Sequence, residues 1–267
     1  MEALIAALLA AILGGLGISG KVERGIEGQL RQQMPDVKEL KVEVHRGHRS
    51  PLSRQVDLID ITLADFTAQS VPGGLQIGGG GDLVGKVGKV AIHARDFRVA
   101  GGAPPNDLPV ARLEITIKDI RYNLWKAVWR RKLRIMRVGD SQAEAWLKAP
   151  ALAKMLAPRV KQVENLRLRF DEGRIEILGD ARVAVHIPVR LSCSLAAVGG
   201  KIYVVDPQAH VSVVPVPSFV VTRLLDEINP LVDANEKSQG PFLLDIDQIE
   251  ITPQALRLHA ALKPKMK

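Results

Sequence analysis

Cysteine and aromatic residues are scarce in this chain of 267 residues. The single cysteine, Cys193, excludes an internal disulfide and any metal site built from several cysteines, and its place in an alternating apolar run predicts a buried, inert thiol. Because aromatic residues make up only 4% of the chain, a core must come mainly from Val, Leu, Ile and Ala, within a total apolar content of 46%. Branched aliphatic side chains favour strands, so the composition predicts a β-rich interior.

Recognisable catalytic motifs are also lacking. Residues 80–86 resemble a Walker loop, but Val87 stands where a Ser or Thr should bind magnesium, and a strand is predicted to follow instead of a helix. No G-x-S-x-G motif is present, and the six histidines are scattered. Asp245 and Asp247 share one face of a predicted strand, where a solvated polar face explains them better than acid/base chemistry. We therefore expect neither enzymatic activity nor a cofactor or metal.

Alternating apolar and polar residues run through two parts of the chain, residues 36–120 and 160–263. A period of two is typical of strands with one buried and one solvated face. In the first part the alternation shifts phase between Val56 and Ile59, which predicts a β-bulge. In the second part Gly199-Gly200 predicts a tight hairpin, and the seven alternating apolar positions before it predict an unusually long strand.

Long alternating strands favour an elongated sheet over a compact sandwich. The fold class predicted is α+β, an elongated and strongly curved antiparallel sheet or β-roll wrapped around amphipathic helices. After an apolar leader over residues 1–19, residues 20–267 are expected to form a single elongated domain. Its two β-rich halves, 36–120 and 160–263, are joined by residues 121–158, a stretch that holds all three tryptophans. This stretch is predicted to be helical over residues 123–132 and from Ser141 onward, with a short strand over residues 133–138 between the two helices.

Three segments show the period of an amphipathic helix. Residues 19–34 form a charged segment that a proline ends, and residues 217–229 form another with a clear apolar stripe. In the third, from Ser141 to Ala157, Ser141 and Glu144 have the spacing of a capping box. Each of these helices is expected to pack its apolar stripe against the sheet.

Positive charge is concentrated between Asp119 and Asp140, within a chain of net charge +8. Seven basic and no acidic residues lie there, with Trp125 and Trp129 about one helical turn apart. Near an anionic bilayer each Lys or Arg contributes about 1 kcal/mol, and indole rings favour the headgroup level. A solvated surface is the simpler alternative, and nucleic-acid binding is not expected because no recognisable motif accompanies the charge. The residues predicted to dock on an anionic membrane surface are Trp125, Lys126, Trp129, Arg130, Arg131, Lys132, Arg134 and Arg137.

The leader contains 16 uncharged, mostly apolar residues from Ala3 to Ile18. As a helix these would span about 24 Å, which is short for a hydrocarbon core of about 30 Å. A secretory signal with a cleavage site at Gly17-Ile18-Ser19 fits better. Because no basic residue precedes the apolar run, an uncleaved short anchor and a plain buried helix stay open as alternatives. We expect an exported or membrane-anchored protein of the cell envelope.

Four segments of the chain resemble the LmeA-like phospholipid-binding family of bacteria, whose fold is similar to that of tubular lipid-binding proteins. The likeness covers nearly the whole chain after the leader and rests on periodicity and turns. It implies a phospholipid partner whose acyl chain lies in an apolar groove, in or near the cell envelope. The segments are the leader with VERGIEGQLRQQM, the pair KVEVHRG and VDLIDITLADF, the run LRLRFDEGRIEILGDARVAV, and SFVVTRLLDEINPLVD with FLLDIDQIEITPQALRL.

The sequence leaves two arrangements of the interior open. The helices either leave a groove for an acyl chain or fill the interior completely, which would make the protein a structural component of the envelope that acts through protein partners. No protein partner is predicted. The residues expected to line a groove are Trp146, Leu147, Leu152, Met155, Leu156, Phe219, Val220, Leu224, Leu225 and Ile228.

Overall fold

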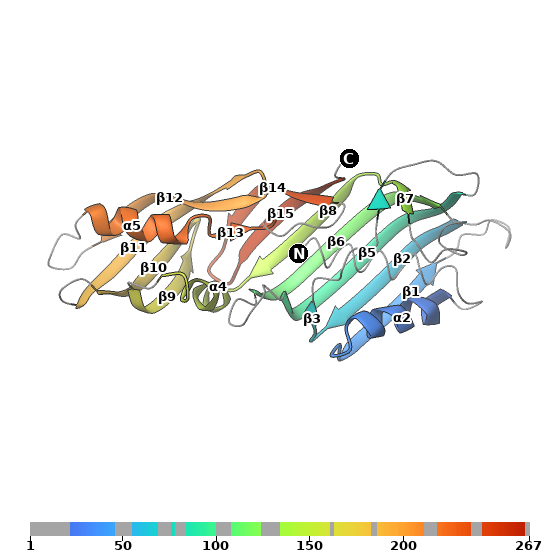
Figure 1. Cartoon of the computed structure of the whole chain (residues 1–267), viewed down its shortest axis with the longest axis horizontal. Coiled ribbons are helices and arrows are strands. Elements are labelled where there is room, and N and C mark those ends of the chain that lie inside the picture. The colour runs from blue at the N-terminus through green and yellow to red at the C-terminus, as the bar shows by residue number, and fades with distance from the viewer. Residues whose placement is uncertain are drawn as a thin grey trace.

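Two β-sheets lie end to end along the long axis of the protein in the computed structural model (Figure 1). The structure describes residues 22–45, 55–68, 76–77, 84–99, 108–123, 134–160, 163–182, 186–210, 218–235 and 242–264. The predictions for the leader and for residues 124–133 of the basic stretch lie outside these ranges.

The larger sheet has ten strands, and its main order is β1-β2-β5-β6-β8-β15-β14. Most neighbours are antiparallel, as predicted, but β2 and β3 each run parallel to β5, and β4 runs parallel to β7. Parallel strands need a long connection, and 15 residues (69–83) separate β3 from β5 in the sequence. The strands are β1 (Glu39–His45), β2 (Gln55–Ala64), β3 (Thr67–Ala68), β4 (Gln76–Ile77), β5 (Val84–Val99), β6 (Leu108–Asn123), β7 (Arg134–Arg137), β8 (Ser141–Leu147), β14 (Phe242–Ile251) and β15 (Leu256–Pro264).

The smaller sheet has five antiparallel strands in the order β13-β12-β11-β10-β9. Its long strand β11 and the hairpin that follows confirm two predictions, because Gly199 and Gly200 both adopt positive φ at the turn into β12. The strands are β9 (Val163–Asp171), β10 (Arg174–Arg182), β11 (His186–Val198), β12 (Lys201–His210) and β13 (Val232–Asp233).

Two of the three predicted helices are confirmed as α2 (Val22–Gln33) and α5 (Ser218–Ile228). In α2, Ile26 and Leu30 are fully buried, and the helix packs beside β1. The third prediction is wrong over its first half, because residues 141–147 form strand β8 and only Ala149–Leu156 form a helix, α4. Its apolar residues also fit a period of two, and pairing with β6 and β15 on either side selects the strand.

The last two strands of the chain return to the larger sheet, where β15 pairs with β8 and β14 forms the far edge. Strands from both β-rich parts of the chain therefore lie in the larger sheet. Within residues 134–158 the chain first forms β7, which confirms the strand predicted over residues 133–138. It then forms β8 in place of the predicted helix, before α4 begins.

Buried and exposed residues alternate along the strands of the larger sheet, and at two levels this alternation shifts by one residue. The shift occurs in three neighbouring strands at the same level. The predicted offset in the apolar alternation between Val56 and Ile59 is confirmed. Strands β5 and β6 show the same offset at that level, and the pairing of residues between the strands continues without a shift. Such irregularities bend and twist a sheet. We call them the first bulge line (Asp57, Gly88 and Asp119) and the second bulge line (Asp65, Asp96 and Ala111).

Aspartates mark these lines because their backbone leaves the extended region. Asp65, Asp96 and Asp119 have φ of 53°, 49° and 49°, values that Asp tolerates better than β-branched residues do. At the first bulge line, a Cβ on Gly88 would come within 2.7 Å of the Asp57 carbonyl oxygen, so glycine is required for the close approach of the two strands.

The two sheets are joined at β14 into one continuous wall. The side-chain amide of Asn235 donates to the Leu244 carbonyl (2.8 Å) and accepts from the Leu244 N–H (3.0 Å), as a neighbouring strand would. The Gly173 N–H in the β9–β10 turn donates to Ile251 O at 3.3 Å. A Cβ on Gly200 would lie 2.3 Å from Leu244 O, so this hairpin glycine also fits tightly against β14. We call these contacts the seam.

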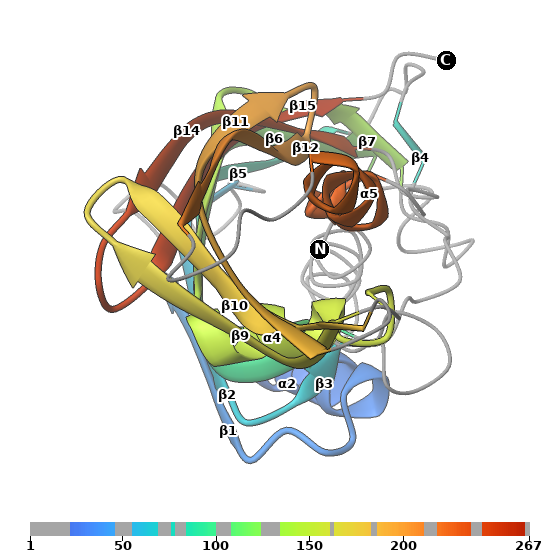
Figure 2. The same ribbon diagram turned by 90° about the vertical axis from the view of Figure 1, so that its left-hand side faces the viewer.

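Seen along the long axis, the wall curls into a half-barrel, and α5 lies beside β12 near its open side (Figure 2). This curvature confirms the coarse prediction of a β-rich, strongly curved sheet. The wrapping of that sheet around amphipathic helices stays a prediction.

Candidate functional site

One face of the larger sheet is apolar and buried, and we call it the inner face. Between the two bulge lines its side chains are at most 1% exposed. Near the second bulge line Phe66 stacks on Phe97 with ring centroids 4.8 Å apart. The buried residues between the lines are Ile59, Ile61, Leu63, Val90, Ile92, Ala94, Leu113, Ile115 and Ile117.

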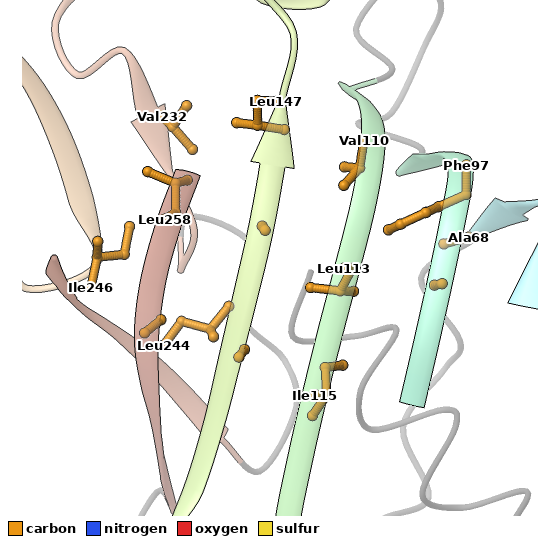
Figure 3. Close-up of a cluster of buried hydrophobic side chains, with 14 of the residues drawn as sticks. Ala68, Phe97, Val110, Leu113, Ile115, Leu147, Val232, Leu244, Ile246 and Leu258 are labelled. Carbon is orange, nitrogen blue, oxygen red and sulfur yellow. The ribbon is translucent and has the colours of Figure 1, made fainter. Parts of the chain in front are cut away.

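The inner face continues across the seam into the smaller sheet. In Figure 3 a cluster of buried side chains reaches from Phe97 and Leu113 over Leu147 and Leu258 to Val232 of β13. On the smaller sheet Ile175, Ile177, Leu191, Cys193, Ile202 and Val204 are equally buried. These residues belong to one hydrophobic cluster that runs through both sheets.

Cys193 lies within this cluster, as predicted. Burial raises the pKa of its thiol to about 11, despite the opposing effect of the nearby Arg174 charge. The thiol is therefore protonated and unreactive near neutral pH. At the other end of the inner face, burial raises the pKa of Tyr122 to about 12. Both groups add hydrogen-bonding atoms to the apolar interior without adding charge at neutral pH.

The opposite, outer face carries a layer of paired charges. Glu144 accepts a hydrogen bond from Arg257 (2.9 Å) and lies 3.3 Å from His259 Nδ1. The hydrogen bond to Glu144 is the largest cause of a raised pKa at Arg257. On the adjacent strand β6, Glu114 pairs with Arg112 of the same strand. In the part of the chain that the structure describes, no three His, Cys, Asp or Glu side chains converge as metal ligands would.

Trp146 belongs to this outer face. The guanidinium carbons of Arg112 and Arg257 lie 4.8 Å and 5.3 Å from the centre of its ring, one on each neighbouring strand. Because side chains alternate along β8, Trp146 and Leu147 point to opposite faces of the sheet. The prediction that both line one apolar surface followed from the wrong helix and is wrong.

The other predicted groove residues whose side chains the structure describes belong to, or pack against, the same hydrophobic cluster. Leu147, Leu152, Met155 and Leu156 are buried, and α4 packs against β9 and β6. On α5, Leu224 and Ile228 are buried and Leu225 is half-buried, whereas the side chains of Phe219 and Val220 lie outside the described residues. Arg159, just after α4, donates to the carbonyl of Pro230, just after α5, at 3.2 Å.

Asparagine side chains fix the chain after α5. The side-chain amide of Asn229 accepts from the Val204 N–H (2.8 Å) and donates to the Val204 carbonyl (3.1 Å). It thereby pairs these backbone groups of β12 as a neighbouring strand would. Six residues later Asn235 does the same for β14 at the seam. No sequence pattern indicates either role, because a side-chain amide that mimics a strand is recognised only from the pairing. The end of α5 is thus attached to both sheets.

The predicted docking residues are only partly described. Trp125, Lys126, Trp129, Arg130, Arg131 and Lys132 lie outside the described ranges, as does the side chain of Arg134. Arg137 is exposed on β7, directly opposite Arg121 of β6. No described helix is long and apolar enough to cross a membrane.

Sequence reasoning missed the strand contribution to the candidate site. The alternation of apolar residues in β5, β6, β14 and β15 was a visible signal, but it was assigned to the core and not to a binding surface. Figure 3 shows that Leu113, Leu244 and Leu258 share one surface with the predicted Leu147. The candidate site therefore includes the apolar face of the sheet as well as residues of α4 and α5.

These observations define a β-rich protein whose long, curved wall has an apolar inner face and an ion-paired outer face. The chain belongs to the LmeA-like phospholipid-binding family, whose sequence profile matches residues 83–261, about two thirds of its length. The matched region runs from β5 into β15 and includes the seam, α4 and α5. The earlier segments that also suggested the resemblance, in α2, β1 and β2, lie outside it. No curated protein and no solved structure matches the chain.

Proposed function

We propose that this protein binds a phospholipid and holds its acyl chains against the inner face near the seam, between the wall, α4 and α5. The observation that carries the proposal is an apolar face continuous across both sheets, in a member of a phospholipid-binding family. Each methylene group moved from water to such a surface contributes about 0.8 kcal/mol. A diacyl lipid therefore gains ample free energy from a surface of this length.

Access to the inner face is the step that the protein must provide, because its side chains are buried. The described element best placed to open it is α5, which contacts β12 and is fixed at its C-terminal end by Asn229. Its apolar stripe also contains the half-buried Val221 and Leu225. Displacing α5 about this fixed end exposes apolar surface on both the helix and the sheet.

The setting we propose is the bacterial cell envelope, where a non-enzymatic protein of this kind stores a phospholipid or carries it between membranes. The apolar leader supports export or anchoring, and the basic stretch supports contact with anionic membrane surfaces. Cell fractionation with mass measurement of the mature N-terminus tests the location. The absence of ester turnover on phospholipid substrates tests the non-enzymatic role.

Native mass spectrometry of protein purified without detergent, followed by lipid extraction, tests the central proposal. Leu225→Gln places a polar group on the half-buried stripe of α5 and should weaken lipid capture about tenfold, because the lost apolar burial is about 1–2 kcal/mol. Leu243→Gln is the matched control, since Leu243 is 39% exposed between two buried residues of β14. Equal capture by both variants contradicts the proposed location.

A second candidate function is a structural envelope protein with a filled core. The near-complete burial of the inner face favours it. It predicts a lipid-free mass that does not change after incubation with liposomes. A stoichiometric phospholipid in the purified protein excludes it.

A further inference from the structure

Basic side chains gather on the outer face of β5, β6 and β7, beside the first bulge line. Lys89 of β5 lies opposite Lys118 of β6, and Lys86 of β5 lies opposite Arg121 of β6. Arg121 in turn lies opposite Arg137 of β7. We call these five residues the cationic patch. Only Arg121 and Arg137 lie in the basic stretch of the sequence, because the other three join them through strand pairing.

The charges of the cationic patch are poorly compensated. Among the described residues Lys86 has an ion pair, with Asp119 at 3.6 Å, and the other four have none. Asp57 and Asp140 are exposed nearby but form no ion pair within the described ranges. Like charges directly opposite each other on neighbouring strands repel. The arrangement therefore favours an anionic partner that lies across all three strands.

The same outer face between the two bulge lines has a different character. There Arg95 pairs with Glu39, Arg112 pairs with Glu114, and Arg257 pairs with two glutamates. Within the described part of the chain, these arginines of the outer face between the two bulge lines are thus paired with carboxylates, unlike four of the five residues of the cationic patch. The cationic patch also coincides with the place where the segment 124–133, with two tryptophans and four basic residues, leaves β6 and returns to β7.

We infer that the cationic patch is a docking surface for an anionic phospholipid bilayer. The choice of partner rests on the proposed function, since a protein that takes up phospholipid must approach a membrane. The strands that carry the patch also carry the inner face, with Val87 and Ile120 buried at the same level. Docking through the patch brings this end of the apolar surface to the bilayer.

The test compares two double variants that remove the same charge. Lys89→Gln/Lys118→Gln neutralises an opposed pair in the patch, and Lys148→Gln/Lys154→Gln neutralises two exposed lysines at α4. Partitioning to vesicles of phosphatidylcholine with 30 mol% phosphatidylglycerol is measured at low and high salt. Each lysine near an anionic surface changes partitioning about fivefold, so the patch variant should bind the vesicles about 30-fold more weakly at low salt. The α4 variant should bind them nearly as well as the natural protein.

Several results would overturn the inference. One is an equal loss of vesicle binding in both double variants, and another is binding to pure phosphatidylcholine vesicles as tight as binding to the anionic vesicles. A third is patch-dependent binding to duplex DNA that is tighter than vesicle binding at equal phosphate concentration, which would make the partner a nucleic acid. Lys89→Arg/Lys118→Arg should keep vesicle binding, which separates loss of charge from loss of folding. Native mass spectrometry of the same variants should show unchanged lipid capture. Vesicle binding through the patch without any captured lipid would refute the proposed function and leave the docking surface standing.

Discussion

Replacing Asn235 by alanine should open the seam between the two sheets. The substitution removes both hydrogen bonds to Leu244 and leaves an N–H and a carbonyl of β14 without partners. A fully buried unpaired group costs about 1–3 kcal/mol, and this edge is only partly buried. We therefore expect the free energy of unfolding to fall by about 2–3 kcal/mol.

The isosteric variant Asn235→Asp sharpens the test. It keeps an acceptor for the Leu244 N–H but places a second oxygen where the amide donates at 2.8 Å to the Leu244 carbonyl. Because two acceptors then face each other, the loss should equal or exceed that of the alanine variant.

Urea unfolding followed by tryptophan fluorescence gives the free energies, and hydrogen exchange at the Leu244 amide reports the seam directly. The exposed amide Gln254, changed to alanine, is the control and should change stability by less than about 0.5 kcal/mol. The reasoning is refuted if Asn235→Ala is as mild as the control and exchange at Leu244 is unchanged.

Two further predictions concern buried ionisable groups and the outer face. Because burial raises the pKa of Cys193 from about 9 to about 11 and that of Tyr122 from about 10 to about 12, the contribution of these two groups to stability is constant below about pH 9. It falls as pH rises further, by about 2–3 kcal/mol for each group. Urea unfolding at pH 7–11 should show this slope, and a Cys193→Ala variant with an undiminished slope between pH 9 and 11 would contradict it. Trp146→Leu should cost about 1–2 kcal/mol by removing the ring between Arg112 and Arg257 but leave lipid capture intact. Lost capture at unchanged stability would instead place Trp146 in the binding surface.

Periodicity predicted the parts of the fold whose signal is local. The helix over residues 217–229 and the offset between Val56 and Ile59 needed only the positions of apolar residues along the chain. The segment 141–147 failed because Ala143, Ala145 and Leu147 fit a strand as well as part of a helix. Its environment between β6 and β15 decides, and the β15 residues that pair with it are more than 100 positions away along the chain.

The candidate site shows the same division between local and distant information. The apolar stripe of α5 was predicted from its own residues, with Leu224 and Ile228 buried as expected. The cationic patch was found only in part, because the register that sets Lys89 opposite Lys118 cannot be read from either segment alone. The parallel pairing of β2 with β5 has the same origin.

The bulge lines restrict how the length of this sheet can change during evolution. At each line three adjacent strands carry the offset at one level, so their pairing stays in register. Deleting Asp96 alone would leave Ala111 of β6 without a partner or slide the end of β5 against its neighbours. A deletion at the same level in all three strands would preserve both pairing and burial. Insertions and deletions at these lines are therefore expected to occur as matched sets across the sheet and not as single events.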